Sequence, residues 1–229
     1  MIIKLQNISK QYQIPGTGKR RTVLDNISLT VAKRQMVGIV GPSGSGKSTL
    51  LNIAGTLDKP NSGDVLIQDV DTATLGDAEL SELRNNRLGF VFQLHHLLPQ
   101  LSLLENVLLH VIPLKNRELK ASAHERAMDL LRIVGLVDKT TQKPGQLSVG
   151  ECQRAALVRA LINEPEILLA DEPTGSLDQR SADELADLLV RINQEKSVSM
   201  IVVTHAEKLA RRMKTVFTLD NGTLNPKSS

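Results

Sequence analysis

The chain has 229 residues, and 41% of them are hydrophobic, so it can bury a sizeable core within one large domain. Lysine and arginine number 28 against 25 acidic residues, and this net charge of +3 is a weak argument for nucleic-acid binding. The single cysteine excludes an internal disulfide framework and a cysteine-built zinc site. No apolar run approaches the roughly 18 residues of a membrane span, and the polar N-terminus MIIKLQNISK does not match a secretory signal. We therefore expect a soluble cytosolic protein that binds no nucleic acid.

Short apolar runs alternate with helix-like stretches along the chain. The runs MVGIV, ILLA and MIVVT are continuously apolar, which is typical of central parallel strands covered by helices on both faces. The first runs are more mixed and lie near the turn-rich segment PGTGKRR, which favours an antiparallel edge sheet. The expected strands are Ile2–Leu5, Ile27–Val31, Met36–Val40, Val65–Ile67, Leu88–Phe92, Ile167–Ala170, Met200–Thr204 and Val216–Leu219. The expected helices are Lys47–Ala54, Ala78–Asn85, Ala121–Val134, Gly150–Asn163, Ser181–Glu195 and Glu207–Met213.

The middle of the chain differs in character from both ends. No strand-like run occurs between Leu94 and Asn163, so this part of the chain is expected to be all-helical. We interpret 94–163 as a helical lobe inserted into an α/β core lobe made of 1–93 and 164–229. The expected fold is thus a single α/β domain over 1–229, with a parallel-sheet core, an N-terminal antiparallel β subdomain and an inserted all-helical subdomain.

The strongest local motif is GPSGSGKS, which directly follows the apolar run MVGIV and directly precedes a helix-compatible stretch. Its glycines let the backbone wrap a phosphate, while the loop N–H groups and the helix N-terminus supply positive potential. Lys47 is expected to reach the β- and γ-phosphates, and Ser48 to offer its hydroxyl to Mg²⁺. An ordinary Gly-Ser turn is the alternative, but it would not require a Lys-Ser pair here. The predicted ATP contacts in this segment are Gly41, Pro42, Ser43, Gly44, Ser45, Gly46, Lys47, Ser48 and Thr49.

Two acids end a later buried run, in ILLADE at residues 167–172. An aspartate at the tip of a parallel strand beside a phosphate loop can hold Mg²⁺, which is the role expected of Asp171. The adjacent Glu172 would face the γ-phosphate and polarise the attacking water as a general base. The alternative is that the pair merely caps a following helix, although Pro173 favours a loop at this point.

The segment LSVGECQR at residues 147–154 resembles the LSGGQ signature of ATP-binding-cassette (ABC) ATPases. It lies upstream of the Asp171–Glu172 strand, as it does in that family. Other family motifs follow in order along essentially the whole chain. They are an adenine-stacking aromatic at Tyr12, a Q-loop glutamine at Gln93, a D-loop at Ser176-Leu177-Asp178 and a switch histidine at His205.

This resemblance implies a P-loop, RecA-like core and a head-to-tail homodimer that holds two ATP molecules between its protomers. Each phosphate loop would face the signature of the other protomer, where a helix N-terminus provides an anion site. The implied nucleotide contacts outside the phosphate loop are Tyr12, Gln93, Ser148, Gly150, Glu151 and Asp178. The implied Mg²⁺ ligands are Ser48, Gln93 and Asp171. The implied catalytic residues are Lys47, Gln93, Glu172 and His205.

Two residues depart from the usual signature. Val149 stands where most family members carry glycine, so it would strain the loop if that position required a positive φ, or weaken the dimer if phosphate approached closely. Cys152 follows the signature and is interpreted as a small packing residue rather than a reactive thiol.

Lesser features each have a plain alternative. His205 could be a satisfied core histidine, and Tyr12 could simply pack at a sheet edge. The pair His95-His96 lacks an accompanying carboxylate or cysteine cluster, which argues against a metal site. The run KRR at 19–21 most simply forms a solvated hairpin tip.

Two classes of ABC ATPase remain to be separated, transporter subunits and soluble repair or translation proteins. Lys47 and Ser148 are 101 residues apart, without heptads or cysteines between them, and the chain carries one cassette. Both features favour the transporter class, whose ATPase works with separate integral-membrane permease subunits. The segment LHHLLPQLSLLENV at 94–107 resembles the group that includes LolD, MacB and FtsE.

Within this group the resemblance to LolD is greatest, and it implies lipoprotein release with LolC- and LolE-like permeases. It also implies a peripheral location on the cytoplasmic face of the inner membrane. MacB- or FtsE-like mechanotransmission or export is the alternative.

The stretch Leu97–Val107 is rich in leucine and interrupted by Pro99. One interpretation is that its leucines face the core of the helical lobe. The other is a groove that accepts an amphipathic helix of a membrane subunit, with Leu98 or Leu101 exposed. Both interpretations remain open at this stage.

Overall fold

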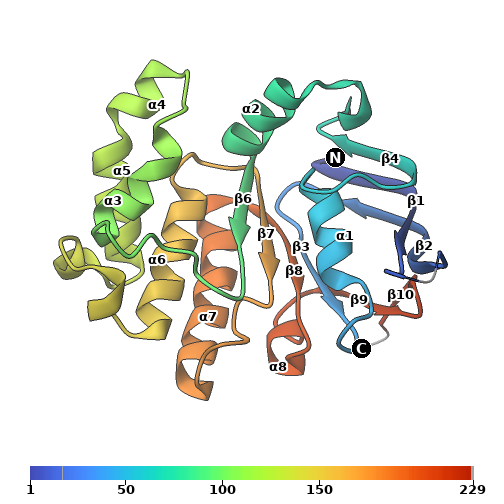
Figure 1. Cartoon of the computed structure of the whole chain (residues 1–229). Helices are drawn as coiled ribbons and strands as arrows, with labels where there is room; N and C mark the ends of the chain where they lie inside the picture. The colour runs from blue at the N-terminus through green and yellow to red at the C-terminus, as the bar shows by residue number, and fades with distance from the viewer. Residues whose placement is uncertain (17, 228–229) are drawn as a thin grey trace.

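The structure is a computed structural model that describes residues 1–16 and 18–227, so Thr17 of the turn-rich PGTGKRR segment lies outside the described residues. The described strands form two sheets (Figure 1). One is antiparallel, in the order β2-β1-β4-β5, and the other has the order β10-β9-β3-β8-β7-β6. In the second sheet β9, β3, β8, β7 and β6 run parallel, and β10 is an antiparallel edge strand. This arrangement confirms the expected parallel core and antiparallel N-terminal sheet.

Each expected strand overlaps an observed one, but β1 and β2 are much longer than expected. Their outer ends, 11–13 and 20–22, are exposed and mostly polar, so they carry little apolar signal and are defined by pairing with each other. The antiparallel sheet contains β1 (Ile3–Gln13), β2 (Arg20–Val31), β4 (Ser62–Ile67) and β5 (Val70–Asp71). The parallel sheet contains β3 (Met36–Val40), β6 (Leu88–Val91), β7 (Ile167–Asp171), β8 (Ser199–Val203), β9 (Thr215–Asp220) and β10 (Thr223–Pro226).

The helices follow the expected order, and α1 has the expected bounds. Outside the middle segment the helices are α1 (Lys47–Ala54), η1 (Thr72–Thr74), α2 (Asp77–Arg87), α7 (Gln179–Lys196) and α8 (Glu207–Ala210). The middle segment contains α3 (Leu103–Leu108), η2 (Leu109–Val111), α4 (Arg117–Ala121), α5 (Ala123–Ile133), η3 (Val137–Lys139), η4 (Pro144–Gln146) and α6 (Val149–Leu161). None of the helices within the described part of the chain is long and apolar enough to cross a bilayer.

Sequence reasoning missed α3, although a local signal for its start exists. The Ser102 hydroxyl accepts a hydrogen bond from the Glu105 backbone N–H at 3.3 Å, and Glu105 Oε2 accepts one from the Ser102 N–H at 2.7 Å. This reciprocal pair is a capping box, which a serine followed three residues later by glutamate predicts. The helix is only six residues long, so its apolar periodicity was too short to identify it.

The continuously apolar strands divide their side chains between two hydrophobic cores. On β7, Ile167 and Leu169 pack into the core beneath the antiparallel sheet and α1. The alternate residues Leu168 and Ala170 pack into the core formed with α6 and α7. Figure 1 shows α1 on one side of the parallel sheet and α6 and α7 on the other. Because successive side chains of a strand point to opposite faces, a strand buried on both faces must be apolar throughout.

The helical segment shares its core with the parallel sheet. Leu103, Val107 and Leu131 are completely buried and belong to the same hydrophobic cluster as Leu168 of β7. Truncating such a leucine to alanine typically costs about 2–5 kcal/mol, and here it would loosen the contact of the helices with the sheet as well. The helical segment and the strands that carry the site described next are therefore packed around one core.

Candidate functional site

The predicted site residues follow three neighbouring parallel strands. The order β3-β8-β7 brings together the loop after Val40, the Thr204-His205 pair after Val203, and the Asp171-Glu172 pair at the end of β7. The loop after Val40 lies more than a hundred residues from the other two segments in sequence. Because the strands are parallel, their carboxyl ends meet at one edge of the sheet, where ligands bind in open α/β folds.

The loop after β3 curls around the side chain of Lys47, which is 7% exposed. Its ammonium donates hydrogen bonds to the carbonyl oxygens of Gly41 at 2.9 Å and Pro42 at 3.0 Å. A Cβ at Gly41 would lie 2.2 Å from the Leu219 carbonyl oxygen, so glycine is required there by space. Gly46 has a φ of 103° and caps α1, a conformation that side chains other than glycine rarely adopt. The loop thus surrounds a buried cation at a helix N-terminus, which is an anion-binding arrangement.

The carboxylate of Glu172 lies beside this cation and beside His205. Its Oε1 is 3.9 Å from Lys47 Nζ and 2.9 Å from His205 Nδ1, and its Oε2 accepts a hydrogen bond from the His205 backbone N–H at 3.1 Å. Glu172 has a φ of 45°, a backbone strain that costs about 1–3 kcal/mol. The His205 side chain is 66% exposed, so the core-histidine interpretation is wrong.

Asp171 contributes an oxygen that lacks a protein partner. Its Oδ1 is buried without a hydrogen bond, while Ser48 hydrogen-bonds to the same carboxyl group. Burial raises the pKa of Asp171, and the Ser48 hydrogen bond and the Lys47 charge act in the opposite direction. A carboxylate and a hydroxyl are hard oxygen ligands of the kind that Mg²⁺ prefers. The pair does not cap a helix, because α7 begins at Gln179 with Asp178 as its N-cap.

Lys47, Ser48, Glu172 and His205 line a cleft of about 700 Å³. The lining residues are Arg21, Val23, Ser43, Gly44, Gly46, Lys47, Ser48, Thr49, Gln93, Glu172 and His205. Residues 19–21 are exposed, as expected of a solvated hairpin tip, and Arg21 also lines the cleft. In the β1–β2 ladder it lies directly opposite Tyr12, and directly opposed residues share one face of a sheet. The sequence alone did not predict this place for Arg21, because it depends on how β2 pairs with β1.

Tyr12 is 43% exposed and is not among the residues that line the cleft, but it hydrogen-bonds to Thr49, which is. Its hydroxyl donates to Asp58 Oδ2 at 2.6 Å, and the Lys10 ammonium lies 5.0 Å from the centre of its ring. Burial raises the pKa of Tyr12, as does the hydrogen bond to Asp58, while one to Thr49 lowers it. Sequence reasoning missed Lys10 and Asp58, which hold the ring through contacts that only folding brings about.

The segment that carries Gln93 is held from two directions. Ser176 Oγ donates to the Gln93 carbonyl oxygen at 3.1 Å, which ties it to the loop after Glu172. On the other side, Gln153 Nε2 donates to the Phe92 carbonyl oxygen at 2.7 Å. Arg159 donates to the carbonyl oxygens of both residues of the His95-His96 pair, each at 2.7 Å. Gln93 is therefore coupled to α6 through two side chains that the sequence alone did not single out.

The His95-His96 pair has structural contacts rather than a metal-site geometry. His95 Nδ1 accepts a hydrogen bond from the Leu97 N–H at 3.1 Å, and burial lowers the pKa of His95. Within residues 1–16 and 18–227, histidine, cysteine, aspartate and glutamate form no cluster that could hold a metal ion.

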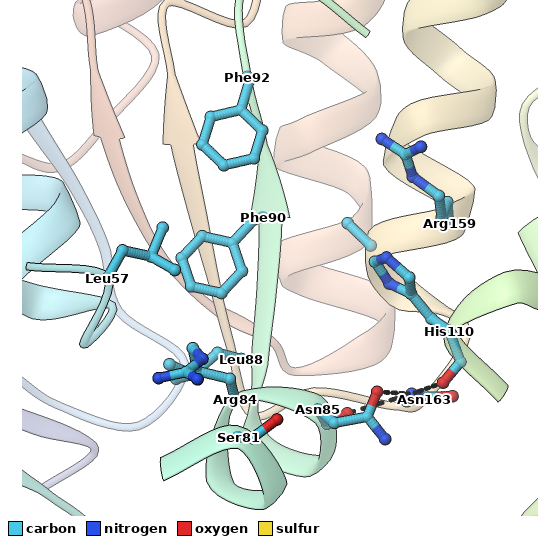
Figure 2. Close-up of a pocket in the computed structure, with 11 residues that line it drawn as sticks. Leu57, Ser81, Arg84, Asn85, Leu88, Phe90, Phe92, His110, Arg159 and Asn163 are labelled. Atoms are coloured by element: carbon cyan, nitrogen blue, oxygen red, sulfur yellow. Dashed lines mark hydrogen bonds between the residues drawn. The ribbon is translucent and has the colours of Figure 1, made fainter. Parts of the chain in front are cut away.

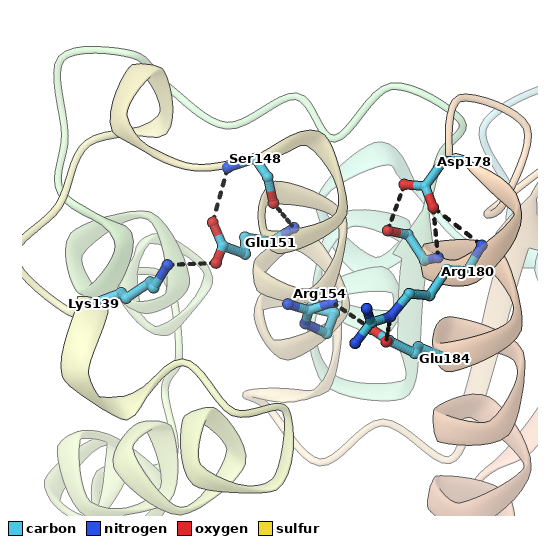
Figure 3. Close-up of polar contacts among 8 residues, drawn as sticks. Lys139, Ser148, Glu151, Arg154, Asp178, Arg180 and Glu184 are labelled. Atoms are coloured by element: carbon cyan, nitrogen blue, oxygen red, sulfur yellow. Dashed lines mark hydrogen bonds and ion pairs between the residues drawn. The ribbon is translucent and has the colours of Figure 1, made fainter.

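The signature segment begins α6 with a second capping box (Figure 3). Ser148 Oγ accepts from the Glu151 N–H at 3.2 Å, and Glu151 Oε2 accepts from the Ser148 N–H at 2.8 Å. Val149 opens the helix without a positive φ and is 53% exposed, so the position does not impose the backbone strain considered for valine. Gly150 is buried against Ser181, whose Oγ would lie 3.1 Å from an added Cβ.

Cys152 and Asp178 have clear structural roles. Cys152 is 2% exposed, its Sγ lies 3.6 Å from the Pro144 carbonyl oxygen, and burial raises its pKa, as expected of a packing residue. Asp178 Oδ1 accepts from the backbone N–H groups of Arg180 and Ser181, both at 3.0 Å, and so caps α7. The predicted nucleotide contacts therefore fall into two groups, one around the cleft and one at the N-termini of α6 and α7.

Comparison with known proteins places these features in a family. A family model described as ABC transporter matches residues 24–175. The lipoprotein-releasing system ATP-binding protein LolD of Geobacter metallireducens is 46% identical over 222 residues, which cover 96% of each chain. LolD of Legionella pneumophila is 42% identical, covering 98% of this chain and 97% of its own. A dimeric post-hydrolysis structure of the ATP-binding cassette MJ0796, bound to ADP and Pi, matches with a TM-score of 0.87 and 38% identity over 99% of this chain and 98% of that one.

The family match spans the phosphate loop, the Gln93 segment, the signature and the Asp171-Glu172 pair. The relatives extend that likeness over nearly the full length of the chain. The chain therefore belongs to the ABC transporter family, in which it is an ATP-hydrolysing subunit of the LolD type.

Proposed function

We propose that this chain is the ATPase of a lipoprotein-releasing transporter and drives separate permease subunits through ATP-dependent dimer closure. The observation that carries the proposal is the convergence of Lys47, Glu172 and His205 in one cleft of a chain whose relatives bear the LolD name. The site supports ATP hydrolysis, and the names of the relatives support lipoproteins as the transported substrate.

In the cleft, the loop N–H groups and Lys47 bind the β- and γ-phosphates of ATP. Ser48, Asp171 and Gln93 would hold Mg²⁺, and the unpartnered buried Asp171 Oδ1 beside Ser48 fits that ion. Bound there, Mg²⁺ neutralises charge that develops on the phosphate oxygens. Tyr12 and Arg21 stand on one face of the hairpin, where the adenosine end of the nucleotide would leave the cleft.

Glu172 acts as the general base that polarises the attacking water. His205 holds the base from one side through Nδ1 and the backbone N–H, and Lys47 approaches the same oxygen from the other. Gln93, which also lines the cleft, orients the water beside the γ-phosphate. The strained backbone at Glu172 keeps the carboxylate aimed into the cleft.

The second group of residues acts on the nucleotide of a partner protomer. Ser148, Gly150 and Glu151 at the start of α6, with Asp178 at the start of α7, face the phosphate loop of the other chain. The two matched structures of the MJ0796 cassette are dimeric, which supports a dimer for this chain; the second matches with a TM-score of 0.86 and 40% identity. Nucleotide that contacts both protomers only in the closed dimer favours closure by that difference in affinity.

The permease docks between the two lobes. A pocket of about 330 Å³ opens there, with Phe90 and Phe92 of the β6 segment on one side and His110 and Arg159 on the other (Figure 2). The two phenylalanine rings stack with their centres 6.0 Å apart. An aromatic wall facing a buried guanidinium suits an amphipathic cytoplasmic helix of the permease.

The leucine-rich stretch Leu97–Val107 contains both core residues and an exposed one. Leu97, Leu103 and Val107 are buried in the core, whereas Leu98 is 46% exposed. Asn106 fixes the exposed residue by accepting from the Leu98 N–H at 2.7 Å and donating to its carbonyl oxygen at 3.1 Å. Leu98 is therefore exposed on a loop whose backbone is held by Asn106. Three residues earlier, the His95 carbonyl oxygen accepts a hydrogen bond from Arg159 of α6.

Co-purification with the membrane partner tests this function directly. A tagged Glu172→Gln protein, trapped with ATP, should retain permease subunits that mass spectrometry identifies as LolC- and LolE-like. The same permease subunits, reconstituted into proteoliposomes with the unsubstituted ATPase, should release a lipoprotein only when ATP is hydrolysed. A complex that instead contains a single-chain exporter, or that hydrolyses ATP without releasing lipoprotein, would contradict the transported class while leaving the ATPase assignment intact.

A further inference from the structure

A lysine from a neighbouring turn pairs with the acid at the N-terminus of α6 (Figure 3). Glu151 is the third residue of the helix, and its Oε2 accepts from the Ser148 N–H while its Oε1 pairs with Lys139 Nζ. Lys139 is the last residue of η3, and its side chain reaches Glu151 on α6. The Glu151 side chain is 17% exposed and that of Lys139 is 35% exposed. Solvent therefore screens this pair less than it screens a fully exposed ion pair.

The negative charge of Glu151 has two opposite effects at the N-terminus of α6. As a capping-box acid it interacts favourably with the helix dipole and stabilises the start of α6. The same N-terminus, in the proposed function, receives the phosphates of ATP bound by the partner protomer. Hydrogen bonding to Lys139 keeps the pKa of Glu151 below its ordinary value, so the carboxylate is charged at neutral pH. Left unbalanced, that charge would repel an incoming triphosphate.

Arg154, the next cation along α6, contacts Glu184 and not Glu151. Arg154 lies 3.6 Å from the carboxylate of Glu184 on α7, and Arg180 pairs with the same acid at 3.0 Å. In Figure 3 this group lies on the α7 side of α6, whereas Lys139 approaches Glu151 from the other side. The contact that balances Glu151 is therefore the one from Lys139.

We propose that Lys139 is a positioning residue for ATP bound in trans. Its ammonium neutralises Glu151 and holds the carboxylate within the Ser148 capping box, which leaves the N-terminus of α6 electropositive toward phosphate. The inference rests on the proposed function, because it requires a dimer with ATP between the protomers. Lys139 acts through Glu151 and makes no contact with nucleotide in this scheme.

Dimerisation by the slowly hydrolysing Glu172→Gln protein provides the test. The measurement is the MgATP concentration that gives half-maximal dimer by sedimentation velocity. Adding Lys139→Met should raise this concentration about tenfold or more, because the uncompensated carboxylate repels the partner's phosphates. Glu151→Gln should lower it, since the positive charge then remains without the negative one. The double substitution should return to within about threefold of the Glu172→Gln parent.

Controls separate a charge effect from a folding defect. Binding of fluorescent ATP to the monomer's own phosphate loop should be the same with Lys139→Met as without it. Lys115→Met removes another lysine of the helical segment, paired with Glu82 on α2, and should leave dimerisation unaltered. A Lys139→Met protein that dimerises like its parent, or a defect that Glu151→Gln fails to rescue, would overturn the inference. A Glu172→Gln parent that never dimerises would instead overturn the proposed dimer itself.

Discussion

His205 Nδ1 lies 2.9 Å from Glu172 Oε1, and the His205 backbone N–H donates to the other carboxylate oxygen at 3.1 Å. One residue thus holds both oxygens of a carboxylate whose own backbone has a positive φ. The two residues reach each other from the ends of the adjacent strands β7 and β8. This contact fixes the orientation of the Glu172 carboxylate. Removing the charge of Glu172 and removing the His205 contact should therefore have different effects.

Glu172→Gln should leave ATP binding intact and slow turnover by about 10²-fold or more, the usual scale for loss of a general base. Glutamine is isosteric and can keep the hydrogen bond from the His205 N–H, so the fold should not change. Single-turnover hydrolysis and equilibrium ATP binding measure the two effects. Retained turnover would assign water activation to another group, with His205 the nearest alternative.

Lys47→Ala should weaken ATP binding at least tenfold, or about 1.4 kcal/mol, because a buried cation at the phosphate loop is lost. The Gly41 and Pro42 carbonyl oxygens would also lose their donor, so thermal stability should be recorded alongside. A folded variant that binds and hydrolyses ATP like the unsubstituted protein would remove the phosphate-loop assignment.

Ser148→Arg should block hydrolysis, although Ser148 lies in the signature group rather than in the lining of its own cleft. An arginine there breaks the capping box and obstructs the surface that meets the partner's phosphates. Mixing this variant with Lys47→Ala should rebuild one intact composite site per heterodimer and recover part of the ATPase rate. Mixtures that stay inactive at every ratio would argue against shared sites, unless both sites must be intact for any turnover.

Leu98→Glu should prevent assembly with the permease while preserving the fold and the basal ATPase rate. Its side chain is exposed and its backbone is fixed by Asn106, so a charge changes the surface and not the core. Ile112→Glu is the matched control, since Ile112 is 65% exposed on the same helical segment. Normal assembly and transport by the Leu98 variant would move the permease contact elsewhere.

Mg²⁺ should increase the affinity for ATP less as the pH falls and Asp171 becomes protonated. Because the pKa of Asp171 is raised, this loss should begin at a higher pH than it would for an ordinary aspartate. Burial raises the pKa of Asp171, and only its deprotonated form can hold the ion. Protonation of Asp171 has the opposite effect on the free energy of unfolding. The folded chain binds this proton more tightly than the unfolded chain does. The nucleotide-free protein therefore becomes more stable as the pH falls through the folded-state pKa of Asp171. ATP titrations with and without Mg²⁺ between pH 5 and 8 measure the first effect. Asp171→Asn should abolish it.

Local sequence determined most of the elements and the chemistry of the cleft. The phosphate loop and α1 depend on glycines and on Lys47 within one short segment, and β7 and β8 carry apolar residues on both faces because both faces are covered. The signature serine and Glu151 form a cap over three residues, within the reach of a single helical turn. Such features depend on neighbours in the chain, so sequence reasoning could find them.

Contacts between distant segments were decided only by the tertiary structure. Arg159 reaches His96 across 63 residues, and Arg21 joins the cleft because β2 pairs with β1. Which leucine of a leucine-rich stretch becomes exposed, and which lysine neutralises Glu151, depend on how separate helices pack around one core. Residue identity and spacing carry no record of such packing, because long-range contacts form only when the whole chain closes around its buried surface.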